Sequence, residues 1–185
     1  MGAYFHDVGK MKRPLFFIEN QMSKDNPHDK IAPTLSHLII TSHVRDGLEM
    51  QEAYRLPKPI RDICEQHHGT TVLMYFYNKA LELDKSGSVS MDDFRYAGPK
   101  PQTKEAAIIM LCDAVEAAVR AMNRPTPNRI ESVIHKIVKD RLNDGQLDEC
   151  NLTLKDIDKA GDAFLRTLNG IYHARIEYPE LPKQN

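Results

Sequence analysis

The sequence has few cysteines, almost no net charge and no hydrophobic run long enough to cross a membrane. Cys64, Cys112 and Cys150 lie far apart and form no Cys-x-x-Cys pair, which argues against a zinc–thiolate site and fits reduced thiols in the core. A formal net charge of −1 provides no general attraction to nucleic acid or to an anionic membrane. We therefore expect no nucleic-acid polymer as partner, and any anionic substrate must be held locally.

The sequence also lacks convincing strands and internal repeats, and helical periodicity runs through most of it. At 185 residues, with 41% hydrophobic and 28% charged residues, it has the size and composition of one globular domain, residues 1–185. We predict an all-α fold of about six or seven helices. The clearest helices are expected over residues 33–55, 57–69, 71–83 and 104–122, followed by one from 127 and one from 154 to about 178.

Two further local features complete the pattern. Thr126 is expected to cap the helix that begins at Pro127, and Thr153 with Asp156 resembles a capping box. Residues 84–103 are rich in Ser, Asp, Gly and Pro, and we expect them to form an exposed, mobile loop.

Polar residues of the kinds that bind divalent metals are scattered through this apolar pattern. Imidazoles and carboxylates suit a pair of borderline divalent ions, and a carboxylate inside an apolar helix is costly unless something positive binds it. Each residue alone has a plainer explanation, such as a surface dipeptide or a hydrogen-bonded core group. Together they predict a two-metal hydrolase site formed by His6, Asp7, His43, His67, His68 and Asp113.

The other charged and imidazole groups carry less weight. Lys10 follows the His-Asp pair in HDVGK, where it would act as a point charge on a phosphate oxygen, although an ordinary surface lysine is the alternative. The remaining histidines stand in polar surroundings and are expected to face solvent: His28, His37, His135 and His173.

The order HD…H…HH…D on an all-α chain resembles the HD-domain phosphohydrolase superfamily. The resemblance is closest to the cytoplasmic HD domain of the seven-transmembrane HD receptors, the PgpH-type cyclic-di-AMP phosphodiesterases. The segments that carry it are FHDVGKMKRPLFFIENQ, NPHDKIAPTLSHLIITSHVRDG, EQHHGTTVLMYFYNKA and MLCDAVEAAVR. It implies a helical HD-domain bundle and a second-messenger signalling role in the cytoplasm for one part of a bacterial inner-membrane protein, and it leaves a homodimer open.

The resemblance also implies a binuclear centre of iron or manganese. By analogy, His6, Asp7 and Asp113 would hold one metal, while Asp7 bridges to a second metal held by His43, His67 and His68. The family carries one more ligating histidine on a helix upstream of the His-Asp pair. Because that pair stands here at residues 6 and 7, we expect an N-terminally truncated domain with weaker occupancy of the first metal and reduced activity.

The expected reaction is hydrolysis of cyclic di-AMP to the linear pApA. Water activated between the two metals would attack phosphorus in line, with Asp7 and Lys10 as the catalytic residues. Three alternatives stay open: a nucleotide-binding sensor or interaction domain with little activity, an HD hydrolase acting on another nucleotide, and an HD-type oxygenase, for which no oxidation substrate is indicated. A cyclic-di-GMP enzyme of the HD-GYP type is disfavoured because HHGTTVLMYFY contains no GYP signature.

Overall fold

The computed structural model describes residues 1–21 and 25–172, and this part of the chain is almost entirely helical. The all-α prediction is confirmed: the described ranges contain no strand, only an isolated antiparallel bridge between Val72 and Arg95. None of the helices in these ranges is both long and apolar enough to span a membrane. The seven α-helices are α1 (Gly2–Phe5), α2 (Pro33–Ala53), α3 (Lys58–Gln66), α4 (Met74–Leu83), α5 (Lys104–Arg120), α6 (Pro127–Asn143) and α7 (Leu154–Tyr172).

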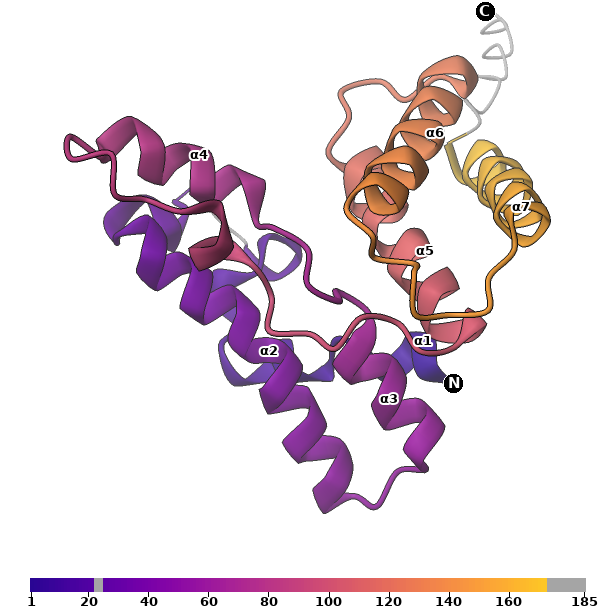
Figure 1. The fold of residues 1–185 in the computed structure, drawn as a ribbon, viewed down its shortest axis with the longest axis horizontal. Helices are drawn as coiled ribbons and strands as arrows, with labels where there is room; N and C mark the ends of the chain where they lie inside the picture. Colours follow the sequence, from indigo (N-terminus) through magenta and orange to yellow (C-terminus); the bar gives the residue numbers. More distant parts are fainter. Residues whose placement is uncertain (22–24, 173–185) are drawn as a thin grey trace, which may run out of the picture.

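Within residues 1–21 and 25–172, five short 3₁₀ helices link these elements, and four of them end by residue 30. They are η1 (Val8–Lys12), η2 (Pro14–Phe16), η3 (Ile18–Asn20), η4 (Pro27–Lys30) and η5 (Met91–Phe94). Figure 1 shows α2 and α4 on one side of the molecule and α5, α6 and α7 on the other, with α1 and α3 between these two groups. The first residues of the chain therefore lie between the two groups of helices.

Local sequence signals explain where several helices begin. Thr103 caps α5 by accepting a hydrogen bond from the Ala106 amide at 3.2 Å. The capping box before α7 is confirmed, because the Asp156 amide donates to Thr153 Oγ1 and the Thr153 amide donates to Asp156 Oδ2, both at 3.2 Å. Helix α6 begins at Pro127 as predicted, but the Thr126 side chain makes no capping hydrogen bond, so that part of the prediction was wrong.

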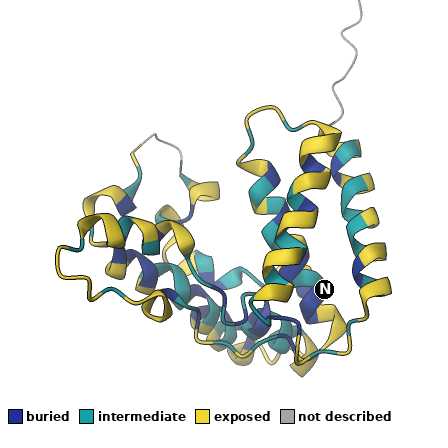
Figure 2. Ribbon diagram, turned by 45° about the horizontal axis from the view of Figure 1, so that its top comes forward, coloured by how far each residue is buried: buried dark blue, intermediate teal, exposed yellow. Residues whose placement is uncertain are grey.

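Helix α5 supplies the central part of the core. Its first half buries Ala107, Met110 and Leu111 against Leu147 and Ile157. Its second half buries an apolar cluster against α6 and α7, formed by Val115, Val119, Ile130, Ile134 and Leu168. Figure 2 shows buried residues on the inner sides of the packed helices and exposed residues on their outer sides. This packing holds α5, and with it Asp113, in a fixed place.

The segment 84–103 combines an exposed stretch with two anchors. Most of residues 85–93 are exposed, as expected, but Phe94 and Tyr96 keep only 1% and 7% of their surface accessible. Phe94 packs against Phe76 and Ala80 of α4. The mobility of this segment stays a prediction, and its second half is tied to the core.

The expectation that His28 and His37 face solvent was wrong. His28 is 4% exposed and its Nε2 lies 2.9 Å from the Phe16 carbonyl, while His37 is 9% exposed with Nε2 3.0 Å from the Arg95 carbonyl. Both rings satisfy backbone carbonyls of distant segments, which periodicity within one helix cannot reveal. His135 is exposed as predicted, and His173 lies outside the described residues.

Candidate metal centre

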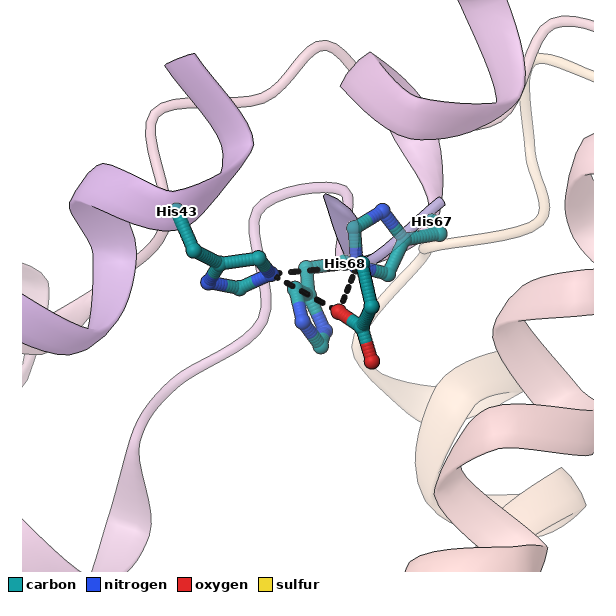
Figure 3. A group of neighbouring side chains, drawn as sticks. His43, His67 and His68 are labelled. Atoms are coloured by element: carbon teal, nitrogen blue, oxygen red, sulfur yellow. Dashed lines mark hydrogen bonds and ion pairs between the residues drawn. The ribbon is translucent and has the colours of Figure 1, made fainter. Parts of the chain in front are cut away.

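The six predicted ligands come from five separate elements and lie close together in the structure. His6 ends α1, Asp7 precedes η1, His43 lies in the middle of α2, and His67 ends α3 with His68 next to it, whereas Asp113 comes from α5. Figure 3 shows His43, His67 and His68 converging from the ends and sides of their helices. The structure thus brings the six residues together in two adjoining groups, and their role as metal ligands stays a prediction.

A close backbone contact brings the His-Asp pair to α2. Gly9 is buried in η1, and a Cβ atom at this position would collide with the backbone of His43 and Gly47. Only glycine therefore allows η1 to lie directly on the middle of α2. This contact places Asp7 beside His43.

Three of the histidines are each oriented by an equivalent hydrogen bond to a backbone carbonyl. The Nδ1 atoms of His6, His43 and His67 lie 2.9, 2.6 and 2.7 Å from the carbonyls of Ala3, Ile40 and Cys64, each three residues earlier. A carbonyl can only accept, so Nδ1 carries the proton in each ring and, in the neutral form, Nε2 keeps a free lone pair. This is the arrangement in which a metal-binding histidine is held by its second ring nitrogen.

The Asp7 carboxylate lies between two groups of donors. Its Oδ1 atom is 3.3 Å from His43 Nε2 and 3.5 Å from His67 Nε2, and these two nitrogens are 3.3 Å apart. Its Oδ2 atom is 3.3 Å from His6 Nε2, which in turn lies 3.5 Å from Asp113 Oδ1. The ligand atoms of Asp7, His43, His67 and His68 lie within 4.8 Å of one another, as do those of His6, Asp7 and Asp113.

This donor set fits two divalent cations. Because the Nδ1 atoms of His43 and His67 carry the protons, the Nε2 lone pairs of the two neutral rings face each other. This arrangement is repulsive unless a positive charge lies between them. Within the described part of the chain, His6 Nε2 and Asp7 Oδ1 are also buried without a hydrogen-bond partner. Such unpaired groups are costly, and mixed imidazole and carboxylate donors are what borderline divalent metals bind.

The electrostatics of the metal-free centre keep Asp7, His67 and His68 in the protonation states that metals require, whereas His6 keeps a proton that a metal would have to displace. Burial alone would raise the pKa of Asp7, but His43, His6, His67 and Lys10 outweigh it and hold that pKa far below its usual range. Burial is the main cause that lowers the pKa of His67 and of His68, so both rings are neutral near pH 7. For His6 burial acts in the lowering direction, but Asp113 and Asp7 raise the pKa to about 10.

Lys10 contacts the outer side of this centre. Its Nζ atom lies 2.7 Å from Asp7 Oδ2 and 2.7 Å from Glu19 Oε1. The same atom is 5.3 Å from the centre of the Phe17 ring, which is within cation–π range. Burial would lower the pKa of Lys10, but Asp7 and Glu19 raise it, so the ammonium stays charged beside the carboxylate.

Two cavities open beside the centre. One of about 760 Å³ is lined by His6, Asp7, Lys10 and Asp113, together with apolar residues such as Ile109 of α5. The other, of about 770 Å³, is lined by His68 and by a neighbour that sequence reasoning missed, Tyr96. The Tyr96 ring stacks on His68 with centroids 4.2 Å apart and planes at 22°. Both cavities have the usual size of a small-molecule site.

Comparisons with known proteins find similar sequences over the whole chain. The family model of the HD domain matches residues 1–118. The chain is 55% identical over 184 residues to the cyclic-di-AMP phosphodiesterase PgpH of Bacillus subtilis (strain 168), covering 100% of this chain and 26% of that protein. It is 51% identical over 180 residues to the protein of the same name from Listeria monocytogenes serotype 1/2a (strain 10403S), covering 97% of this chain and 25% of that protein. The chain thus spans about a quarter of the length of the curated relatives it matches.

A solved structure is similar along nearly the whole chain. The crystal structure of the L. monocytogenes phosphodiesterase PgpH HD domain in complex with cyclic-di-AMP superposes with a TM-score of 0.88 at 51% identity. The match covers 96% of this chain and 81% of the other. A second crystal structure of the same HD domain gives a TM-score of 0.87 at 50% identity.

Proposed function

This chain belongs to the HD domain family, and from that premise we propose that it hydrolyses cyclic di-AMP to pApA at a two-metal centre. The observation that carries the proposal is the position of Asp7, whose two oxygens face two separate groups of donors. The chain is similar over almost its full length to an HD domain solved in complex with cyclic-di-AMP, and this similarity supports the choice of substrate.

The geometry supports an assignment of the residues that would hold the metals. His6, Asp7 and Asp113 would bind the first ion, and Asp7, His43, His67 and His68 would bind the second. Neutral imidazoles and carboxylates suit iron or manganese, the two metals we propose. Bound ions of this kind lower the pKa of a water molecule and stabilise negative charge on a phosphate.

The chain's own residues have distinct tasks in this reaction. Asp7 fixes the separation of the two donor groups by contacting both. Lys10 holds the outer oxygen of Asp7 and places a positive charge at the edge of the cavity, where an additional negative charge on a phosphate oxygen is stabilised. Tyr96 packs flat on His68 and limits the rotation of that ring.

The surroundings of the domain are also part of the proposal. The relatives are about four times as long as this chain, which supports its being one domain of a larger protein. We propose that the parent protein is embedded in a bacterial inner membrane and that this domain lies in the cytoplasm and takes part in second-messenger signalling. A cyclic dinucleotide is the proposed small-molecule partner, and a homodimer is an additional hypothesis.

Product analysis tests the substrate and reaction class. The protein loaded with Mn²⁺ or Fe²⁺ is incubated separately with cyclic di-AMP, cyclic di-GMP and deoxynucleoside triphosphates, and the products are separated by chromatography. The proposal expects pApA from cyclic di-AMP and slower turnover of the other substrates. Tight binding of cyclic di-AMP without turnover would instead support a sensor domain, and preferential turnover of a triphosphate would identify a different HD hydrolase.

A further inference from the structure

The turn that carries the double histidine is held from outside by a distant part of the chain. Residues 67–71 follow α3, and the His68 carbonyl accepts hydrogen bonds from the Thr71 amide at 3.1 Å and from Thr71 Oγ1 at 2.9 Å. Gly69 has φ +54°, and a Cβ atom there would collide with the side-chain oxygen of Gln146. The tight turn thus packs directly on Gln146, which lies between α6 and α7.

Gln146 uses both ends of its amide on this turn. Its side chain is completely buried, and its Oε1 atom accepts a hydrogen bond from the Thr70 amide at 2.9 Å. Its Nε2 atom donates to Thr70 Oγ1 at 2.9 Å and to Asp144 Oδ2 at 2.8 Å. A buried amide bonded at both ends fixes its neighbours in one geometry, because any displacement leaves a buried polar group unpaired.

Arg95 extends the same network to the other side of the turn. Its Nη1 atom donates to the Thr70 carbonyl at 2.7 Å, and its Nη2 atom donates to Asp144 Oδ1 at 3.0 Å. The amide, hydroxyl and carbonyl of Thr70 are therefore all bonded by Arg95 and Gln146. We call Arg95, Asp144 and Gln146 the turn clamp.

His68 depends on this clamp more than the other histidines do. The rings of His6, His43 and His67 are each oriented by a backbone carbonyl. In the described ranges, the His68 ring has no such hydrogen bond, and its close neighbours include the rings of His67 and Tyr96. Tyr96 follows Arg95 directly, so the ring that stacks on His68 is joined to the clamp by one peptide bond.

We propose that Gln146 is a positioning residue for the second metal. It holds residues 68–70 so that the His68 ring is directed at the donor group of Asp7, His43 and His67. The proposal rests on the proposed two-metal function. It means that the loop between α6 and α7 influences metal affinity through the turn that carries His68. A merely structural Gln146 would stabilise the fold without changing how tightly the formed centre binds a metal.

Metal titration of the metal-free protein separates these two roles. Gln146→Met keeps the approximate volume of the side chain and removes all its hydrogen bonds, whereas Leu168→Ala opens a cavity in the α5–α7 core away from the turn. Titration with Co²⁺, followed by its visible absorption, reports the affinity and the ligand geometry. We expect Gln146→Met to weaken the Co²⁺ affinity of the second metal site about 10- to 100-fold and to alter the absorption band of that site. We expect Leu168→Ala to lower the melting temperature and leave the affinity unchanged.

The controls make each outcome decisive. Thr70→Ser keeps the hydroxyl and should preserve the affinity, while Thr70→Val removes one bond to Gln146 and should weaken it. Wild-type affinity and absorption in Gln146→Met would overturn the proposal; if that variant does not fold, wild-type affinity in Thr70→Val would do so. No substrate is present in these titrations. A protein that binds Co²⁺ as expected but, loaded with Mn²⁺ or Fe²⁺, leaves cyclic di-AMP intact would therefore refute the proposed function alone.

Discussion

The Nε2 atoms of His43 and His67 lie 3.3 Å apart, although the Nδ1 atom of each ring is hydrogen-bonded to a carbonyl of its own helix. The two rings come from α2 and α3, so the helix packing holds them in this contact. Asp7 Oδ1 completes a triangle with distances of 3.3 and 3.5 Å to these nitrogens. Without a cation, the folded protein keeps acceptor atoms close together at a cost in free energy.

Metal binding should therefore stabilise the fold. A ligand that binds only the native state adds about 2.7 kcal/mol to the free energy of unfolding when its free concentration is 100 times its Kd. For a chain of this size, that corresponds to a rise of about 5–10 °C in melting temperature. Calorimetry of the metal-free protein with and without Mn²⁺ checks this, and His43→Ala with His67→Ala should abolish most of the shift. An equal shift in the double variant would contradict the assignment of the site.

The two donor groups should differ in affinity. One contains four residues of this chain and the other contains three, with Asp7 shared between them. More donors from the chain give tighter binding, so we expect one tight and one weaker class of site in a Mn²⁺ titration. Asp113→Asn should remove only the weaker class, and His43→Ala should remove the tighter one. Two equal sites, or loss of the tighter class in Asp113→Asn, would contradict this ranking.

Lys10 should affect turnover more than metal binding. Its ammonium lies at the edge of the cavity lined by His6, Asp7 and Asp113, where it can stabilise charge on a phosphate. We expect Lys10→Met to lower kcat about 100-fold, near the lower end for loss of one stabilising donor.

Lys12→Met is the matched control for this prediction. Lys12 is partly exposed and pairs with the exposed Glu49 and the buried Asp46. Arg13 also pairs with Asp46, so that carboxylate keeps a partner when Lys12 is replaced, and kcat should stay unchanged. Steady-state kinetics with cyclic di-AMP, combined with metal analysis of each variant, measures both effects. Similar rates for Lys10→Met and the wild type would exclude a catalytic role for Lys10.

Asp144 should make the stability of the domain sensitive to acid. Burial acts to raise the pKa of Asp144, but Arg95 and Gln146 outweigh it and lower that pKa below the ordinary value. A carboxyl group with a lowered folded pKa contributes stability above its unfolded pKa of about 3.9, and this contribution is lost as the pH falls through the folded pKa. We expect Asp144→Asn to be less stable than wild type at pH 7 and the difference to shrink below about pH 4. Urea midpoints of the metal-free wild type and Asp144→Asn at several pH values measure this difference in stability. A difference that does not change with pH would contradict the lowered pKa of Asp144.

The long helices could be predicted because their signals are local, whereas the ligand set was inferred from its residue types and from the resemblance to a known family. The run 104–122 is apolar on several sides and became the central helix α5 (Lys104–Arg120), and the isolated Asp113 within it indicated the site. Thr153 and Asp156 are only three residues apart, so their capping box is also visible in the sequence. The residues that share a helix or a capping box are close together in the chain, whereas the six predicted ligands are not.

The features that were missed either lack periodicity in the sequence or depend on contacts between distant segments. The 3₁₀ helices of the first 30 residues have no periodicity that distinguishes them from a loop. His37 was expected in solvent, yet it bonds the carbonyl of Arg95, 58 residues later. Gln146 lies 76 residues after Thr70, and nothing in its local sequence indicates that the two are hydrogen-bonded.

Paired measurement of metal content and product formation, for wild type and for Asp7→Asn, tests the central claim most directly. Both proteins are loaded with Mn²⁺ and desalted, and the bound metal and the conversion of cyclic di-AMP to pApA are determined on the same sample. The two-metal account predicts turnover by the wild type, with metal lost from both donor groups and pApA formation abolished in Asp7→Asn, because Asp7 is the residue that both groups share. Equal pApA formation by the two proteins, or no turnover by metal-loaded wild type, would contradict it.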